Sequence, residues 1–286
     1  MAWLYWDPNP VFVTIPIIGH PIMWYGVCFA VGFVFGYLLL MKIFSRYLGE
    51  KGKAVEVVDR LAWYIVFGTI IGARLGDVFF YDWDICKENL MDIFKIWHGG
   101  LASHGGAVGV IIALFIAWWS LKAKVRNLPF LVLLDFVVIP TALVAAFIRV
   151  GNFFNQEILG TVTSVPWAVV FGHPLDGSPA LPRHPVQLYE SLAYFVLFAV
   201  LAVLWRCKAD ALRRGFISGI FFSFAFSLRF CLEFFKMPQS SLVPYNSSLL
   251  MGQYLSIPFI VAGIVLLIYS TRSKRVFVGE HSHGDC

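Results

Sequence analysis

The sequence predicts an all-α integral membrane protein with seven transmembrane helices. Of its 286 residues, 59% are hydrophobic and only 14% are charged. Soluble domains carry roughly 25% charged residues, and a soluble protein of this size would lack the charges needed to cover its surface. The sequence does not show the alternation of apolar and polar residues that is typical of a membrane β-barrel. The composition therefore excludes an ordinary soluble domain.

Seven windows predict transmembrane helices, because the hydrocarbon core of a bilayer requires roughly 20 mostly apolar residues per helix. The windows are rich in Phe, Leu, Val and Gly, which suits lipid-facing surfaces and close packing between helices. In chain order they cover residues 22–42, 61–81, 104–121, 129–149, 186–206, 215–235 and 252–271.

The ends of these windows carry the aromatic and polar residues that are expected near a membrane interface. "WY" lies near the start of the first window, the second ends in "GARLGDVFFY", and "SHGG" lies at the start of the third. The fourth leads into "RVGNFFNQEILG", and the fifth opens on "RHPVQLYE". The sixth ends in "LRFCLEFFK", and "MGQYLSIP" opens the seventh.

Basic residues in the loops predict the orientation, since Lys and Arg concentrate on the cytoplasmic side. Fifteen of the 22 follow the first, third, fifth and seventh windows, five lie on the opposite side, and Arg74 and Arg229 fall within windows. We therefore expect the N-terminus outside and the C-terminus in the cytoplasm. The dispersed charges do not form a nucleic-acid patch, and no removable signal peptide is expected.

The segment 150–185 is rich in Gly and Pro and contains short β-like runs. Its apolar stretch "VPWAVVF" is too short to cross a bilayer. We expect an extracytoplasmic lobe here, within a single polytopic transmembrane domain that spans residues 1–286. The five cysteines show no spacing typical of a disulfide framework or a metal site, so we assign no metal and no cofactor.

Under this topology, polar residues of distant windows lie at one depth, near the outer leaflet. A charge at the centre of a membrane helix costs about 2.5–3.5 kcal/mol, so such residues usually face a cavity or a partner. Arginines, a histidine and a helix N-terminus at headgroup depth suit recognition of a phosphate group. The set comprises Tyr25, Arg74, His104, Arg149, Asn152, Glu157, His184, Gln187, Tyr189, Glu190, Arg229 and Glu233.

The charged positions also have structural interpretations. Arg229 and Glu233 stand at i, i+4, so they can neutralise each other on one helix face. Arg74 can pair with Asp77 at i, i+3 in the same way. Arg149 can extend to the lipid headgroups, although Asn152 on the same face is a companion that a simple anchor does not need.

Structural interpretations exist for the aromatic and histidine positions too. Tyr25 suits the aromatic belt of an interface, and His104 can be an interfacial residue without chemistry. The glycines around His104 favour a ligand, because they let a backbone pass close to it. His184 precedes Pro185, where a turn or a contact within the lobe is favoured.

The stretch "RVGNFFNQEILG" resembles the signature of the prolipoprotein diacylglyceryl transferases, bacterial membrane enzymes that lipidate lipoprotein precursors. Six further stretches resemble blocks of the same family in the same order, and together they extend from the first window to the last. They are "IMWYGVCFAVGF", "GARLGDVFFY", "HGGLASHGGAVG", "RHPVQLYES", "RFCLEFFK" and "MGQYLSIP".

The resemblance implies transfer of the diacylglyceryl group of phosphatidylglycerol to the lipobox cysteine in the signal peptide of a prolipoprotein. A thioether forms and glycerol-1-phosphate leaves. It also implies a bacterial cytoplasmic (inner) membrane location, with the active site facing the periplasmic leaflet; we expect a monomer. The alternative from another functional class is a phospholipid-binding transporter or scaffold without a covalent step.

The resemblance also implies roles for individual residues. Catalytic roles fall on His104, Arg149 and Arg229, and phosphatidylglycerol binding on Arg149, Asn152, Arg229, Tyr25, Glu157, Glu233 and Gly105. Supporting roles fall on Asn155, Gly160, Gln187, Tyr189, Glu190 and Arg74. Where the family tends to carry Tyr-Gly before the sixth-window arginine, this chain has Ala225 and Phe226.

Overall fold

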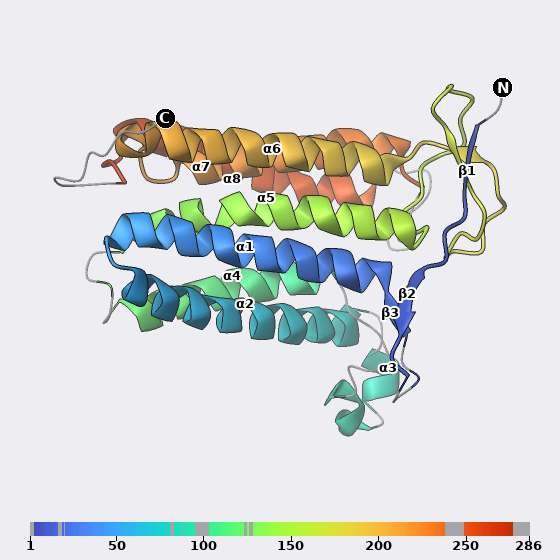
Figure 1. Cartoon of the computed structure of the whole chain (residues 1–286), viewed down its shortest axis with the longest axis horizontal. Helices are drawn as coiled ribbons and strands as arrows, with labels where there is room; N and C mark the ends of the chain where they lie inside the picture. Colours follow the sequence, from blue (N-terminus) through green and yellow to red (C-terminus); the bar gives the residue numbers. More distant parts are fainter. Residues whose placement is uncertain are drawn as a thin grey trace. The chain divides into compact units, whose positions relative to one another are not determined.

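In the computed structural model, the chain is mostly helical with a few short strands (Figure 1). It divides into two compact units. Unit 1 comprises Met1–Leu39 and Asp135–Cys286, and unit 2 comprises Leu40–Leu134. The residues that the structure describes are 3–16, 19, 21–80, 83–87, 89–94, 103–122, 125, 128–237 and 249–276.

A helix overlaps each of the seven predicted windows. These helices are α1 Trp24–Leu48, α2 Lys51–Phe80, α4 Ser103–Leu121, α5 Phe130–Phe154, α6 Val186–Lys208, α7 Phe216–Leu232 and α8 Met251–Arg272. Because α1 and α5 contribute residues to both units, the division does not decide whether the chain is one domain, and the single domain stays a prediction.

Among the residues that the structure describes, five helices are long and apolar enough to cross a membrane: α1, α5, α6, α7 and α8. The span of α6 includes the 3-10 turn η3, Ala209–Ala211, and that of α7 includes the turn η4, Glu233–Phe235. The described part of α4 is apolar but shorter than these. A helical membrane protein is therefore supported, whereas seven spans and their orientation stay predictions.

Glycines let α2 and α4 pack side by side in unit 2 (Figure 1). A Cβ atom added to Gly72 would lie 2.5 Å from the carbonyl oxygen of Gly105, and one added to Gly109 would lie 2.8 Å from the Cα of Gly72. Residues with a side chain would not permit so close an approach of two backbones. The shorter helices α3, Trp83–Cys86, and η1, Leu90–Phe94, follow α2 along the chain.

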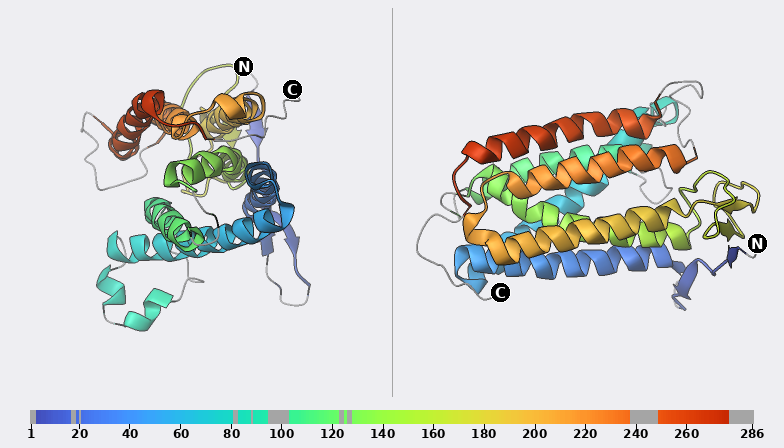
Figure 2. Two further views of the ribbon diagram at one scale, coloured as in Figure 1. Left: turned by 90° about the vertical axis from the view of Figure 1, so that its left-hand side faces the viewer. Right: turned by 90° about the horizontal axis from the view of Figure 1, so that it is seen from above.

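In unit 1, α7 and α8 run side by side (Figure 2). Phe226 of α7 stacks on Phe259 of α8, with ring centroids 4.3 Å apart. Gly263 of α8 lies against Ser223 of α7, leaving no room for a side chain. Phe226 thus packs two helices together at a position where the chain departs from the resembled family.

Asp135 of α5 fixes the start of α7. Its carboxylate accepts hydrogen bonds from the backbone N–H groups of Gly215 at 2.7 Å and Ser218 at 2.8 Å, and from the Ser218 hydroxyl at 2.7 Å. The N-cap residue of α7, Gly215, has no side chain to perform this task. A buried residue of another helix therefore satisfies two backbone N–H groups at this helix start.

The lobe predicted over residues 150–185 forms part of a three-stranded sheet. β1, Leu4–Trp6, pairs in parallel with β4, Val169–Phe171, and β4 pairs antiparallel with β5, Pro182–Arg183. Figure 1 shows β1 beside the loops that follow α5. The sequence predicted the β-like runs of the lobe but missed the N-terminal strand that completes its sheet.

A small apolar core joins this sheet to the end of α5. Trp6 packs against four buried side chains, and its ring centroid lies 4.6 Å from that of Phe153. Its indole N–H donates a hydrogen bond to the carbonyl of Phe153 at 3.1 Å. The N-terminal segment thereby holds the end of α5 in place.

A second sheet pairs β2, Val11–Thr14, antiparallel with β3, Pro21–Met23, immediately before α1.

Candidate functional site

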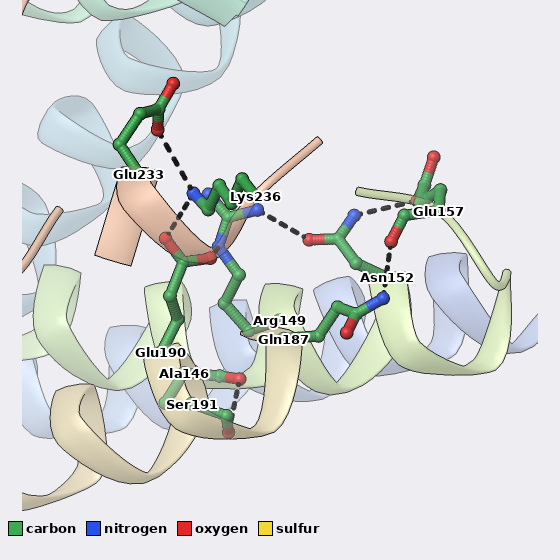
Figure 3. A network of polar contacts seen from close by, with 9 residues as sticks. All are labelled: Ala146, Arg149, Asn152, Glu157, Gln187, Glu190, Ser191, Glu233 and Lys236. Atoms are coloured by element: carbon green, nitrogen blue, oxygen red, sulfur yellow. Dashed lines mark hydrogen bonds and ion pairs between the residues drawn. The ribbon is translucent and has the colours of Figure 1, made fainter. Parts of the chain in front are cut away.

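Three charged side chains meet in unit 1 (Figure 3). They are Arg149 near the end of α5, Glu190 near the start of α6, and Lys236 directly after η4. Glu190 of α6 is the centre of this network, and its side chain is 0% exposed. One carboxylate oxygen, Oε1, accepts a hydrogen bond from Lys236 Nζ at 2.7 Å. The other, Oε2, lies 2.9 Å from Arg149 Nε. One buried carboxylate thus pairs with two cations.

The contact between Arg149 and Glu190 is an ion pair without an aligned hydrogen bond, because Glu190 Oε2 has no hydrogen-bond donor among the described residues. The guanidinium makes its hydrogen bond elsewhere, from Nη1 to Asn152 Oδ1 at 2.9 Å. Within the described part of the chain, the remaining nitrogen, Nη2, has no acceptor. Arg149 therefore keeps one donor group that a ligand can use.

A chain of hydrogen bonds continues from Arg149 along the predicted signature. Asn152 Nδ2 donates to Glu157 Oε1 at 2.7 Å, and Asn155 Nδ2 approaches the same oxygen at 3.4 Å. Gln187 Nε2 donates to the backbone carbonyl of Glu157 at 2.7 Å. The structure thus brings these predicted residues into contact, while their roles in binding a substrate stay predictions.

The turn after α5 places Glu157 by means of an unusual backbone. Its neighbours Gln156 and Ile158 have positive φ angles of 53° and 57°, a left-handed conformation that costs energy for residues with a side chain. The buried Gln156 side chain stabilises the turn, because its amide donates to Asp7 at 3.2 Å and its carbonyl accepts from the N–H of His173 at 2.8 Å. Contacts outside α5 therefore fix this turn.

Lys236 is the member of the network that the sequence did not single out. Its side chain is 3% exposed, and Nζ also lies 3.7 Å from Glu233 Oε2. Burial lowers the pKa of the Lys236 ammonium; the Glu190 carboxylate opposes this shift, and the charges of Arg149 and Arg229 add to it. The only signal in the sequence is the i, i+3 spacing from Glu233, which does not reveal that the lysine is buried.

Arg229 and Glu233 do not form the pair that their i, i+4 spacing allows. α7 ends at Leu232, and Glu233 lies in the turn η4, from which it approaches Lys236. Arg229 has no hydrogen bond or ion pair with any residue that the structure describes. It is nevertheless near enough to Lys236 and Glu190 to interact with their charges. Its guanidinium is thus a further cation beside the network.

Tyr25 of α1 lies beside the same network. A Cβ atom added to Gly151 of α5 would lie 3.0 Å from a ring carbon of Tyr25, so the absence of a side chain at Gly151 makes room for the tyrosine. The phenol interacts electrostatically with Glu157 and Arg149. The structure therefore places Tyr25 against α5, in addition to its predicted place at the start of a span.

Gly160 and His184 pack against each other and against neighbouring residues. A Cβ atom on Gly160 would collide with the carbonyl oxygen of His184, and Gly160 forms a β-bridge with Lys236. The His184 ring lies 3.2 Å from the Tyr189 hydroxyl, which accepts a hydrogen bond from the Trp167 indole at 2.7 Å. The N–H of His184 donates to the carbonyl of Thr161 at 3.1 Å, so the contact within the lobe that was favoured for His184 is present.

A cavity of about 420 Å³ lies on the lobe side of the network. Asn155 and Gln156 form part of its wall. Asn155 also approaches Glu157, so this residue links the cavity to the network. Its other lining residues are Asp7, Pro8, Asn9, Pro10, Met23, Phe154, His173 and Leu175.

Three predicted site residues belong to unit 2. His104 is the second residue of α4, and its side chain lies outside the described residues. A Cβ atom on Gly105 would meet Gly72 and Gly76 of α2, so Gly105 is a packing position within this unit. Arg74 pairs with Asp77 at 3.1 Å and donates to the carbonyl of Ile93 at 3.0 Å, which is the structural pairing that the sequence left open.

The arrangement suits the recognition of an anion. Arg149 and Lys236 contact Glu190, and the charge of Arg229 also acts on it. Among the described residues, Arg149 Nη2 has no acceptor and Arg229 has no partner. Guanidinium groups bind phosphate oxygens through charge-assisted hydrogen bonds. Among the described side chains, no group of three His, Cys, Asp or Glu residues is arranged to hold a metal ion.

Comparison with known proteins gives a consistent result. The profile of a family described as prolipoprotein diacylglyceryl transferase matches residues 10–269. Three relatives are named phosphatidylglycerol–prolipoprotein diacylglyceryl transferase. The protein of Protochlamydia amoebophila is 39% identical, with 97% of each chain covered. That of Tolumonas auensis is 42% identical over 95% of this chain and 99% of its own. That of Chlamydia pneumoniae is 36% identical over 96% and 98%.

Proposed function

The chain belongs to the prolipoprotein diacylglyceryl transferase family, and we propose that it transfers the diacylglyceryl group of phosphatidylglycerol to a prolipoprotein. The observation that carries this proposal is the similarity, over nearly the whole chain, to relatives named for this activity. It favours a transferase over a phospholipid transporter or scaffold. The cations around Glu190 support it, because the substrate carries a phosphate.

In this reaction the sulfur of the lipobox cysteine attacks the carbon of the diacylglyceryl group that bears the phosphate. A C–S bond forms, the C–O bond to the phosphate breaks, and glycerol-1-phosphate leaves with the bonding electrons. The thiol must lose its proton, because a thiol with a pKa of about 8.5 is only slightly ionised at neutral pH. The charge that develops on the phosphate must be stabilised by fixed donors.

We assign the phosphate to Arg149 and Arg229. Arg149 has one nitrogen without an acceptor, and Arg229 has no partner, within the described part of the chain. Asn152 and Glu157 hold Arg149 in its orientation, since their hydrogen bonds form a continuous chain from Nη1. Gly105 and Arg74 keep their proposed roles, binding the lipid and supporting the site, although both have packing or pairing contacts in unit 2.

We assign His104 to removal of the thiol proton or to orientation of the headgroup. Its place in the first turn of α4, between Ser103 and Gly105, supports this proposal, because the free N–H groups of a helix start favour an anion. The variant His104→Gln tests the assignment as a base, because glutamine cannot take up the proton. Transfer that survives with an unchanged pH profile would remove His104 from that role.

We further propose a monomer with seven spans in the bacterial cytoplasmic membrane, with the lobe and the active site at the periplasmic leaflet. The apolar helices and the bacterial relatives support this location. The partner is a prolipoprotein signal peptide that carries the lipobox cysteine.

Incubation of the purified protein with phosphatidylglycerol and a lipobox peptide tests the function. We expect a diacylglyceryl mass addition on the peptide and release of glycerol-1-phosphate, both measured by mass spectrometry. A peptide in which serine replaces the cysteine is the control and should stay unmodified. An unchanged cysteine peptide, together with movement of lipid between leaflets, would favour the transporter instead.

A further inference from the structure

The position of the Lys236 ammonium is fixed by two carboxylates. Its ammonium is buried between the carboxylates of Glu190, at 2.7 Å, and Glu233, at 3.7 Å (Figure 3). A buried ammonium is costly unless it is paired, so these contacts determine where Nζ lies. Because its own charge is already engaged and its side chain is 3% exposed, Lys236 is poorly placed to bind a substrate phosphate directly.

The backbone around Lys236 is held by the loop that follows Glu157. The N–H of Met237 donates to the carbonyl of Leu159 at 3.0 Å, and the N–H of Thr161 donates to the carbonyl of Phe235 at 2.8 Å. These two bonds flank the bridge between Gly160 and Lys236. Lys236 is therefore fixed relative to the loop that contains Glu157, the hydrogen-bond partner of Asn152.

Glu190 divides its two oxygens between two cations. Oε1 binds Lys236 and Oε2 faces Arg149 Nε, while Arg149 Nη2 has no acceptor among the described residues. A carboxylate and a guanidinium favour a bidentate pair, in which both oxygens bind two nitrogens. Without Lys236, both oxygens of Glu190 would be available to Arg149, and the guanidinium would lose its free donor.

We propose that Lys236 is a positioning residue: by holding Oε1 of Glu190, it restricts Glu190 to one contact with Arg149 and leaves Arg149 Nη2 free for a phosphate oxygen of phosphatidylglycerol. This inference rests on the function proposed above. It distinguishes Lys236 from Arg149 and Arg229, since Lys236 acts through Glu190 and does not itself touch the substrate.

Kinetics of the purified full-length protein test the inference. We expect Lys236→Met to raise the KM for phosphatidylglycerol by about tenfold or more with a smaller change in kcat, because Arg149 would then be sequestered by Glu190. Lys236→Arg restores a cation at this position and should recover most of the affinity. Lys208→Met, which removes an exposed lysine at the end of α6, is the control and should leave both constants unchanged. An unchanged KM in Lys236→Met would overturn the inference.

A comparison in the Glu190→Gln background separates positioning from a structural role. If Lys236 acts through the Glu190 carboxylate, Lys236→Met should have no further effect once that carboxylate is gone. A further loss in the double variant would contradict the inference. The comparison remains valid where Lys236→Met alone does not fold, because the double variant removes both buried charges together.

The dissociation constant for phosphatidylglycerol, measured without peptide, provides the same comparison independently of catalysis. A wild-type protein that binds the lipid but does not modify the peptide would refute the proposed function, while the binding constants would still decide the role of Lys236.

Discussion

At the scale of single residues, Arg149 and Arg229 are two cations in different environments. Arg149 is tied to Glu190 and Asn152, whereas Arg229 has no partner among the residues described. We expect Arg149→Ala and Arg229→Ala each to lower kcat/KM at least tenfold, about 1.4 kcal/mol of transition-state stabilisation. Arg272→Ala, an exposed residue at the end of α8, is the control for transfer rates.

Thermal unfolding in detergent separates the two arginines further. Arg149→Ala leaves the buried Glu190 with one of its cations missing, so its melting temperature should fall. Arg229→Ala breaks no ion pair that the structure describes, so its melting temperature should remain near that of the wild type. Wild-type transfer rates in both variants would exclude them as phosphate ligands.

Asp7 predicts a dependence of stability on pH. Hydrogen bonds from the His173 ring, at 2.7 Å, and from Gln156 hold the pKa of the Asp7 carboxyl below its ordinary value. A carboxyl with a lowered pKa stabilises the fold above its unfolded-state pKa of about 3.9 and loses this contribution as pH falls through its folded-state value. The melting temperature of the wild type should therefore exceed that of Asp7→Asn at pH 7, and the difference should shrink below about pH 4. A difference that is undiminished at low pH would contradict this linkage.

At the scale of elements, the close packing of α2 and α4 predicts that the effect of a Gly→Ala substitution on stability depends strongly on its position. A Cβ atom on Gly109 would collide with the carbonyl of Gly68 and lie 2.8 Å from the Cα of Gly72, whereas one on Gly106 would lie 3.5 Å from Ala73 Cβ, an ordinary contact. We expect Gly109→Ala to destabilise the protein by about 1–3 kcal/mol through overpacking. Gly106→Ala is the matched control, and its better helix propensity should keep the protein as stable as the wild type or make it more stable. Equal melting temperatures for the two variants would show that the backbones do not approach so closely.

The elements also show which features sequence can predict. Each long apolar window became a helix, because the period and length of an apolar segment are local properties. The chain from Arg149 through Asn152 to Glu157 was also accessible, since its members lie within nine residues of one another. These local features account for most of the helical fold and for the part of the candidate site that Arg149, Asn152 and Glu157 form.

What sequence missed depends on distant contacts. The burial of Lys236 requires the loop after α5 and the start of α6, and the positive φ angles at Gln156 and Ile158 are supported by Asp7 and His173. β1 exists only because β4, more than 160 residues away along the chain, is its partner. The change from α7 to η4 at Glu233 broke the i, i+4 relation with Arg229, and nothing in the residue types indicates that change.

At the scale of the whole molecule, the number of membrane crossings depends on α2. This helix has 30 residues, so at about 1.5 Å per residue it is longer than a hydrocarbon core of about 30 Å. Its first ten residues carry most of its charges, two of which form the pair Arg60–Glu56. In its second half Arg74 and Asp77 neutralise each other. Charge, and not length, therefore separates α2 from the five apolar helices, and a paired charge does not prevent insertion.

We therefore predict that α2 crosses the membrane, with Lys51 in the cytoplasm and Lys87 outside. Lys51→Cys and Lys87→Cys are introduced separately into a chain whose native cysteines are replaced by alanine. A membrane-impermeant maleimide should label position 87 from the periplasmic side and position 51 only in inverted vesicles. Ala180→Cys and a chain that retains only Cys207 are the controls, because Ala180 precedes α6, one of the five apolar helices, and Cys207 lies at its other end, and both positions are exposed. If these controls label from opposite sides while both α2 positions label from the same side, α2 does not cross, and the seven-span topology with His104 at the outer leaflet is wrong.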